Sequence, residues 1–185
     1  MFTTDYADSH RLLLYGVAAR NNWRLILEDV ATRNIDELIF GGDIGKKETN
    51  KWFFDSFRDF KKHVILGNHD DFDEVKKYFK NSLSKSGKEL FYAYEEGLLK
   101  YIYLDTSSAE LSQHQFQWLT REIQTNKKIL LLMHHPLLKI DSPLDRSYPL
   151  KGREEIKDLL HASEREITIM CGHYHTADEQ WGGKH

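Results

Sequence analysis

The sequence of 185 residues is poor in cysteine, with Cys171 as its single thiol. One thiol cannot form an internal disulfide, so the sequence gives no support for a disulfide-stabilised secreted protein. Its first residues lack the basic segment and apolar run that define a signal peptide. No stretch approaches the roughly 18 continuous apolar residues that a transmembrane helix requires. We therefore expect a cytoplasmic protein.

The chain also has little net charge and few prolines. The formal net charge is −3, so electrostatics gives no reason to expect a nucleic-acid polymer or a membrane as partner. There are only three prolines, and no linker rich in Pro, Gly or Ser interrupts the chain. Hydrophobic residues make up 40% and charged residues 30%, which excludes a wholly disordered chain. We expect a single domain over residues 1–185.

Short apolar segments alternate with segments of helical periodicity. Each apolar segment is bounded by Gly, Pro or polar residues and is rich in Ile, Leu, Val and Tyr, as is typical of strands buried on both faces. The alternation predicts a layered α/β domain with a central sheet, in which functional side chains gather beyond the strand ends. The predicted strands are 36–40, 63–66, 101–104, 129–133 and 167–171, and the predicted helices are 22–33, 50–61, 72–79, 112–124 and 152–161.

Histidine, in contrast, is abundant, with ten in the chain. Several of them follow the predicted strands, together with carboxylate and amide side chains. These donors, without a thiolate cluster, suit Mn, Fe, Zn or Co rather than a structural cysteine–zinc site. In chain order the motifs are Asp8-x-His10, Gly42-Asp43, Gly67-Asn68-His69-Asp70, His134-His135-Pro136 and Gly172-His173-x-His175.

Each motif alone has an ordinary structural explanation. Gly-Asp after a strand is usually a turn, and a lone buried histidine is usually a hydrogen-bonded structural residue. The five motifs in this order favour a metal site. Seven ligands from five loops are too many for one ion that must keep an open position, and they suit two ions about 3.5–4 Å apart, with Asp43 bridging them. The seven are Asp8, His10, Asp43, Asn68, His134, His173 and His175. Such a pair would clamp a phosphoryl oxygen and lower the pKa of a bridging water. Asp5 is a rival to Asp8, and residues 11–18 are a rival first strand without an Asp-x-His motif.

These motifs, in this order, resemble those of the calcineurin-like metallophosphoesterases, from Asp8 to Trp181. The stretches between the ligands are more similar to the class III cyclic nucleotide phosphodiesterases, the bacterial cAMP phosphodiesterase group. The resemblance implies an α/β/β/α sandwich with central mixed sheets. Family members continue with further strands, so we expect the sandwich to lack its C-terminal strands, because the chain ends ten residues after His175. The similar stretches are 14–17, 110–119, 142–145 with Leu150, and 171–175 followed by Trp181-Gly182.

The resemblance also implies a role for each motif residue and a cofactor of two divalent or trivalent transition metal ions (Fe, Mn or Zn). His69 would donate a hydrogen bond or proton to the leaving oxygen, and Asp70 would orient it. A metal-bridging hydroxide would attack, without a covalent enzyme intermediate. His134 would be the ligand because it follows its strand directly, and His135 would face the substrate with Asn68 and His69. One ion would be held by Asp8, His10, Asp43 and His175, and the other by Asp43, Asn68, His134 and His173.

We therefore expect a dinuclear-metal-dependent phosphodiesterase, a phosphoric ester hydrolase whose substrate is a small-molecule phosphate ester. A cyclic nucleotide such as cAMP is the first candidate, and a glycerophosphodiesterase or a broad-specificity phosphomonoesterase is the alternative. Arg146 and Tyr148 are further candidate substrate contacts. A non-catalytic binding module of the same fold is the alternative from another class, and the presence of all seven ligand types speaks against it. An exposed sheet edge at the short C-terminus favours self-association and is compatible with a homodimer.

Overall fold

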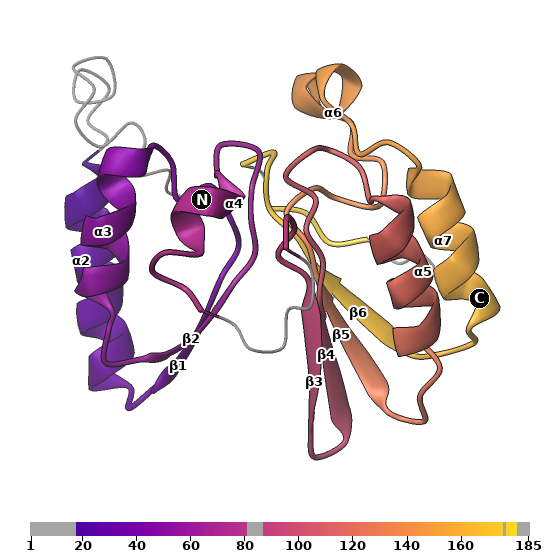
Figure 1. Cartoon of the computed structure of the whole chain (residues 1–185), viewed down its shortest axis with the longest axis horizontal. Helices are drawn as coiled ribbons and strands as arrows, with labels where there is room; N and C mark the ends of the chain where they lie inside the picture. The colour runs from indigo at the N-terminus through magenta and orange to yellow at the C-terminus, as the bar shows by residue number, and fades with distance from the viewer. Residues whose placement is uncertain (1–17, 81–86, 176, 181–185) are drawn as a thin grey trace.

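The structure is a computed structural model that describes residues 18–80, 87–175 and 177–180. Two β-sheets pack against each other in the middle, and helices cover the outer face of each sheet (Figure 1). This layered α/β arrangement, in which one sheet is mixed, confirms the predicted fold class. The predicted ligands Asp8 and His10, the rival Asp5 and the similar stretches at 14–17 and Trp181-Gly182 lie outside the described residues.

The first half of the described chain is a β-α-β unit with two further helices. It comprises α2 (Ala19–Thr32), β1 (Glu37–Phe40), α3 (Lys47–Ser56), β2 (Lys61–Val64) and α4 (Phe72–Val75). The strands β1 and β2 are parallel, with Ile39 opposite His63. Helical spacing places Phe53 and Phe57 on the same buried face of the α3 region, where both rings pack on Trp23 from α2. Aromatic packing therefore fixes α2 and α3 on the outer face of this sheet.

The second half is a four-stranded sheet of order β3-β4-β5-β6. Its elements are β3 (Tyr92–Glu96), β4 (Leu99–Tyr103), α5 (Gln113–Glu122), β5 (Lys128–Leu132), α6 (Pro143–Ser147), α7 (Arg153–Ala162) and β6 (Ile167–Met170). β3 and β4 form an antiparallel hairpin, whereas β4, β5 and β6 are parallel. Crossover helices α5 and α7 bury Leu119 and Ile156 in one core with Ile102 and Leu131 of the sheet.

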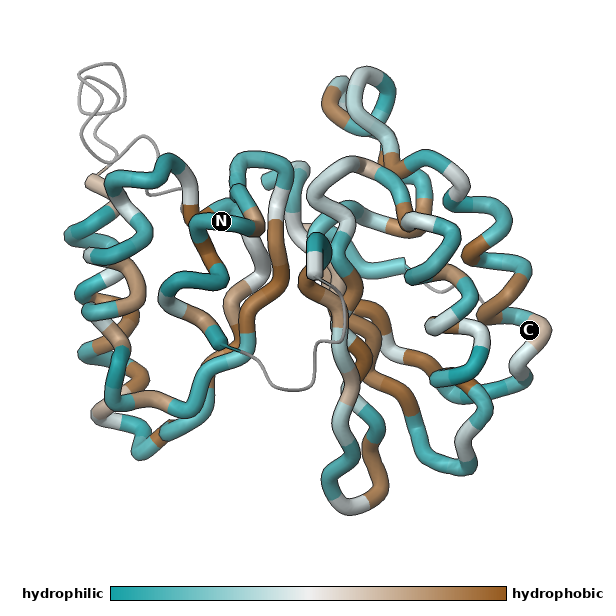
Figure 2. The backbone as a smooth tube through the Cα atoms, viewed as in Figure 1, coloured by the Kyte–Doolittle hydropathy of each residue, from teal (hydrophilic) through white to brown (hydrophobic). Residues whose placement is uncertain are grey.

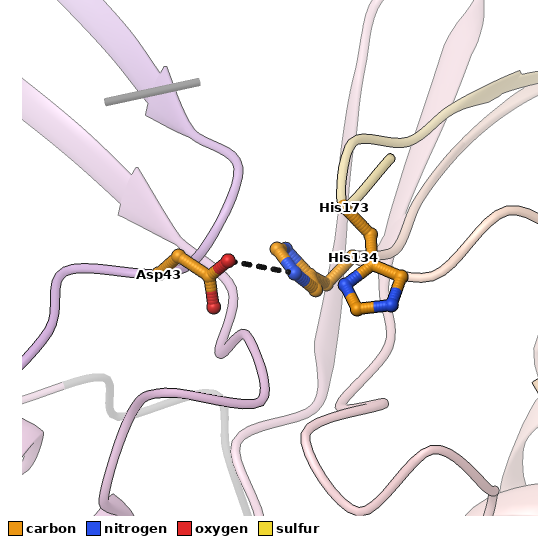
Figure 3. A group of neighbouring side chains, drawn as sticks. All are labelled: Asp43, His134 and His173. Carbon is orange, nitrogen blue, oxygen red and sulfur yellow. Dashed lines mark ion pairs between the residues drawn. The ribbon is translucent and has the colours of Figure 1, made fainter. Parts of the chain in front are cut away.

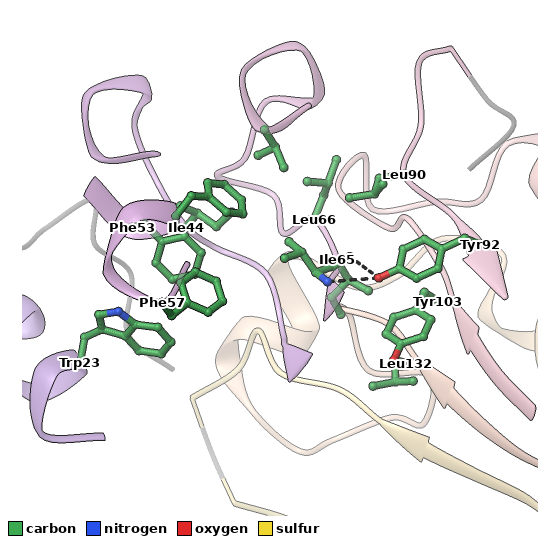
Figure 4. Packing of buried hydrophobic residues seen from close by; sticks show 13 residues of the cluster. Trp23, Ile44, Phe53, Phe57, Ile65, Leu66, Leu90, Tyr92, Tyr103 and Leu132 are labelled. Carbon is green, nitrogen blue, oxygen red and sulfur yellow. Dashed lines mark hydrogen bonds between the residues drawn. The ribbon is translucent and has the colours of Figure 1, made fainter. Parts of the chain in front are cut away.

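The two sheets meet through tyrosine side chains that point across the boundary. The hydroxyl of Tyr92 accepts from the Val64 N–H and donates to the Val64 carbonyl, both at 3.1 Å (Figure 4). His63 stacks on Tyr94 and Tyr103, with ring centroids 4.8 Å and 5.3 Å apart. One hydrophobic cluster therefore contains residues from both halves and joins them into one packed structure.

Hydropathy follows this layering along the backbone. Figure 2 shows hydrophobic residues concentrated on the strands and hydrophilic residues on the outer helices and the connecting loops. Within the described ranges, none of the helices combines the length and the apolarity that crossing a bilayer requires.

The loops after β1, β5 and β6 meet at the boundary between the two sheets. Parallel strands present their carboxyl ends at the same edge of a sheet, and this edge is where polar groups collect in open α/β folds. Asp43 follows β1, His134 follows β5 and His173 follows β6. The topology thus brings these three side chains to one place.

Candidate metal centre

Three donor side chains converge where the two halves meet. The ligand atoms of Asp43, His134 and His173 all lie within 4.8 Å of one another. Figure 3 shows the Asp43 carboxylate approaching from the first half and the two imidazoles from the second. Asp43 and His134 are buried and His173 is half-buried, so water competes little for these donors.

The backbone partner of His134 determines which of its ring nitrogens donates. Its Nδ1 lies 2.8 Å from the carbonyl oxygen of Gly41, and a carbonyl can only accept, so Nδ1 donates. Its Nε2 lies 3.2 Å from Oδ2 of Asp43 without meeting hydrogen-bond geometry. In a neutral imidazole this Nε2 carries a lone pair, which repels a carboxylate unless a cation is shared between them.

His173 brings a second imidazole to the same place. One of its ring nitrogens lies within 4.8 Å of the donor atoms of Asp43 and His134. Buried polar atoms are nearly always hydrogen-bonded, and Nε2 of His134, 3.2 Å from the Asp43 carboxylate, has no hydrogen-bond partner among the described residues. A transition metal ion accepts lone pairs from two imidazoles and a carboxylate, so the residues present fit a metal.

The charge states of the donors agree with metal binding. Burial raises the pKa of Asp43, but the backbone N–H of His69 hydrogen-bonds the carboxylate and helps to hold the pKa below its ordinary value. Burial is the largest cause that lowers the pKa of His173, to about 4. A carboxylate and a neutral imidazole at neutral pH are the ligating forms of these residues.

Two glycines allow the loops of the site to pack backbone against backbone. Gly42 has φ +90°, and a Cβ there would lie 2.6 Å from the Gly67 nitrogen and 2.7 Å from Nδ1 of His134. A Cβ at Gly67 would lie 2.2 Å from Oδ1 of Asp43. Any larger residue at either position would push Asp43 or His134 away, which explains why a glycine precedes Asp43 and Asn68.

Asp70 joins the same two loops through its carboxylate. It accepts the backbone N–H groups of Asp43 at 2.7 Å, Gly67 at 2.8 Å and Gly45 at 3.0 Å. Burial raises the pKa of Asp70 to about 6, against the opposing effect of these N–H donors. Asp70 therefore fixes the loop after β1 to the loop after β2. Its predicted orientation of His69 stays a prediction.

The remaining predicted site residues lie around this group. Asn68 and His69 are exposed on the loop after β2, and the His69 N–H donates to Oδ1 of Asp43 at 3.2 Å. His175 is exposed and is not one of the three converging donors. The predicted roles of Asn68, His69 and His175 stay predictions.

His135 lies beside the three donors but is not one of them. It is buried, its N–H donates to Oγ1 of Thr106 at 3.1 Å, and its ring centroid lies 4.2 Å from that of His173. Burial is the largest cause that lowers the pKa of His135, to about 3, so its ring is neutral. Its predicted contact with the substrate stays a prediction. Thr106, which also follows a strand end, was not among the predicted site residues.

The match to known proteins covers most of the chain. A family model described as calcineurin-like phosphoesterase matches residues 6–177. The chain is 32% identical over 154 residues to a probable glycerophosphodiester phosphodiesterase of Arcobacter nitrofigilis, covering 76% of this chain and 56% of that protein. It is 24% identical over 182 residues to a 3',5'-cyclic adenosine monophosphate phosphodiesterase of Haemophilus influenzae, covering 92% and 66%.

The fold is also similar to that of a solved structure. A purple acid phosphatase from yellow lupin seeds superposes with a TM-score of 0.64 at 15% identity, over 85% of this chain and 33% of that one. This similarity concerns the fold alone. The chain spans 56% and 66% of the length of the two curated relatives above, so these matches do not establish that it has the activity of a whole relative.

Proposed function

Because the chain belongs to the calcineurin-like phosphoesterase family, we propose that it hydrolyses a phosphodiester at a dinuclear metal centre. The observation that carries the proposal is the convergence of the Asp43 carboxylate with ring nitrogens of His134 and His173, all within 4.8 Å of one another. Among the described residues, Nε2 of His134 has no hydrogen-bond partner. Bound metal ions would supply Lewis-acid activation of water and neutralise the phosphoryl charge.

Two sets of residues would hold the ions. Asp43, His134 and His173 already converge, and Asn68 stands on the adjoining loop, so these four form the first set. We assign the second ion to Asp43 with His175 and with Asp8 and His10. Iron, manganese and zinc all suit this mixture of carboxylate and imidazole.

The protein itself would position the ester and supply a proton. The His69 backbone is bound to Asp43 and its side chain is exposed, so the imidazole can reach a phosphate held at the centre. We assign it the transfer of a proton to the leaving oxygen, with Asn68 as a further contact to the phosphate. Asp70, through its three backbone N–H partners, keeps the loop of His69 close to Asp43.

The proposed substrate is a small phosphodiester, with a cyclic nucleotide such as cAMP first. The Haemophilus influenzae relative named for this activity supports it. A glycerophosphodiester is the second candidate, and the 32% identity to the Arcobacter nitrofigilis relative favours it. Both esters make the same demand on the metal centre, so the residues between the motifs must distinguish them.

A substrate comparison tests the proposal. The purified chain would be loaded with Mn²⁺, Fe²⁺ or Zn²⁺ and assayed on cAMP, on a glycerophosphodiester, on bis-p-nitrophenyl phosphate and on p-nitrophenyl phosphate. We expect the diesters to be hydrolysed faster than the monoester. Faster hydrolysis of p-nitrophenyl phosphate would indicate a phosphomonoesterase rather than a phosphodiesterase. Metal content below one ion per chain, unchanged by added Mn²⁺, would indicate a non-catalytic binding module.

A further inference from the structure

The segment between β5 and α7 is attached to the loop that carries His173. It contains α6 and stands above the rest of the second half in Figure 1. The hydroxyl of Tyr174, which lies between the two histidines of the Gly-His-x-His motif, donates to Oδ1 of Asp145 at 2.7 Å. The same hydroxyl lies 3.3 Å from the carbonyl oxygen of Tyr148. One phenolic oxygen therefore joins the α6 segment to the metal-centre loop.

Asp145 is itself held from several sides. It is 3% exposed, and the guanidinium of Arg153 donates to its two oxygens at 2.5 Å and 3.3 Å. The backbone N–H of Ile140 donates to Oδ2 at 3.0 Å. A buried carboxylate with these partners is a fixed acceptor, and a planar arginine fork determines its orientation. The Tyr174 hydroxyl is therefore bound to a rigid group.

The loop that Tyr174 anchors has an unfavourable backbone conformation. His173 and His175 have φ of +71° and +52°, the left-handed region that residues with a Cβ rarely adopt. Such conformations persist only where surrounding contacts over-determine them. Tyr174 lies between these two residues and is buried, whereas His175 is exposed. Its contacts are the ones placed to hold the loop in this form.

The same contacts determine how the imidazole of His173 is presented. The ring centroid of His173 lies 4.8 Å from that of Tyr174 and 5.1 Å from that of His134, so this imidazole contacts both the anchored tyrosine and another donor. Groups that fix the orientation of a ligating histidine affect the affinity for the metal.

We propose that Asp145 is a positioning residue for the metal centre. Through the Tyr174 hydroxyl it holds the loop of His173 in its left-handed conformation and directs the imidazole of His173 toward Asp43. The inference rests on the metal-binding part of the proposed function and not on the identity of the substrate.

Metal affinity tests the proposal independently of catalysis. Tyr174→Phe removes the anchoring hydroxyl and keeps the ring. Tyr94→Phe is the matched control, because its hydroxyl lies 3.3 Å from Glu37 on β1, away from the three donors. The metal-free full chain would be titrated with Mn²⁺ against a competing chelator. We expect Tyr174→Phe to weaken Mn²⁺ binding about 10-fold or more and Tyr94→Phe to change it less than about twofold.

A second measurement separates positioning from folding. Thermal unfolding in excess chelator should give Tyr174→Phe and Tyr94→Phe similar midpoints, and saturating Mn²⁺ should restore kcat of Tyr174→Phe toward that of the unchanged chain. Unchanged Mn²⁺ affinity in Tyr174→Phe would overturn the proposal. Asp145→Asn tests the other end of the contact, and the double variant should bind Mn²⁺ no more weakly than the weaker single variant.

The remaining outcomes are also decisive. If the losses of Mn²⁺ affinity added up in the double variant, Asp145 and Tyr174 would act independently, which would contradict the proposal. Failure of both single variants to fold would show a structural role instead. If the unchanged chain binds Mn²⁺ but hydrolyses no phosphodiester, the proposed function fails and the positioning of His173 can still hold. If the chain is active and the variants bind Mn²⁺ normally, only this inference fails.

Discussion

His134 directs its Nε2 atom at the carboxylate of Asp43 across the boundary between the two sheets, at a distance of 3.2 Å. Since the Gly41 carbonyl binds the other ring nitrogen, the pair is arranged to share a cation rather than a proton. This relationship leads to predictions for the metal ligands, for the glycines that admit them and for the exposed histidine beside them.

Replacing the shared carboxylate should remove the centre altogether. We expect Asp43→Ala to abolish phosphodiester hydrolysis and to deplete both ions, because Asp43 is the ligand assigned to both. Metal analysis of the purified variant and a bis-p-nitrophenyl phosphate assay measure the two effects. Asp59→Ala, at a highly exposed carboxylate, is the control. Near-full activity of Asp43→Ala would be incompatible with a two-ion centre.

A single methyl group at Gly67 should damage the site without removing any ligand. In Gly67→Ala the new Cβ would fall 2.2 Å from Oδ1 and 2.5 Å from the backbone nitrogen of Asp43. We expect a stability loss of about 1–3 kcal/mol, by analogy with overpacking, together with weaker metal binding. Urea unfolding and Mn²⁺ titration test this expectation. Gly87→Ala, whose Cβ would meet nothing within 4 Å, should change neither quantity.

His69 should affect turnover and leave the metals in place. We expect His69→Ala to retain both ions and to slow hydrolysis about 10²–10⁴-fold, the usual cost of losing a general acid. The loss should be smaller for a substrate whose leaving group needs no proton, such as a nitrophenolate ester. His161→Ala, at an exposed histidine in α7, provides the comparison. Loss of metal from His69→Ala would assign His69 to the ligands instead.

The boundary between the sheets should weaken in acid through His63. Burial lowers the pKa of this histidine below 6.5, although Nε2 lies 2.6 Å from a Glu37 oxygen that favours the charged form. Between the lowered pKa and 6.5 the unfolded chain binds more protons than the folded chain, so stability falls as pH decreases through this window.

Urea unfolding in excess chelator at several pH values below 7 measures this effect. His63→Phe keeps an aromatic ring between Tyr94 and Tyr103 and removes the titrating group. Its stability should therefore depend less on pH than that of the unchanged chain. Equal pH dependence in the two proteins would show that His63 does not contribute.

Most of the fold could be predicted because buried strands and helix faces leave strong patterns. The segment 129–133 and the strand β5 (Lys128–Leu132) differ by one residue at each end. β2 was predicted two residues too late, because Ile65 and Leu66 are buried although they follow the strand. The strand instead begins at Lys61, whose backbone N–H donates to the Asp36 carbonyl and whose ammonium pairs with Glu37. Hydrophobicity indicates which residues are buried, but it does not indicate which of them pair with a neighbouring strand.

Two elements were missed for the same reason. β3 has the half-exposed sequence of Tyr92–Glu96, and its pairing with β4 depends on a turn at Gly97, where φ is +54°. α6 has only five residues, too few for a periodic pattern. Both elements are determined by contacts with the rest of the chain more than by their own residues.

The sequence allowed the donor residues of the candidate site to be predicted, but not the hydrogen bonds that hold them in place. Strand-end position and motif order identified Asp43, His134 and His173, and the structure brings these three together. The hydrogen bond from Tyr174 to Asp145 joins residues 29 positions apart, and Tyr174 is the residue that the Gly-His-x-His motif leaves unspecified, so no local pattern predicts the contact. The three N–H groups bound by Asp70 likewise depend on how two loops approach each other.

The three donors come from opposite sides of the boundary between the sheets, Asp43 from one half and both imidazoles from the other. An ion held by all three would act as a reversible cross-link between distant parts of the chain. Each tenfold excess of free metal over its dissociation constant would then add about 1.4 kcal/mol to the resistance of the two halves to separation. A chelator would loosen the junction before either half, so metal supply would affect the architecture as well as the proposed hydrolysis.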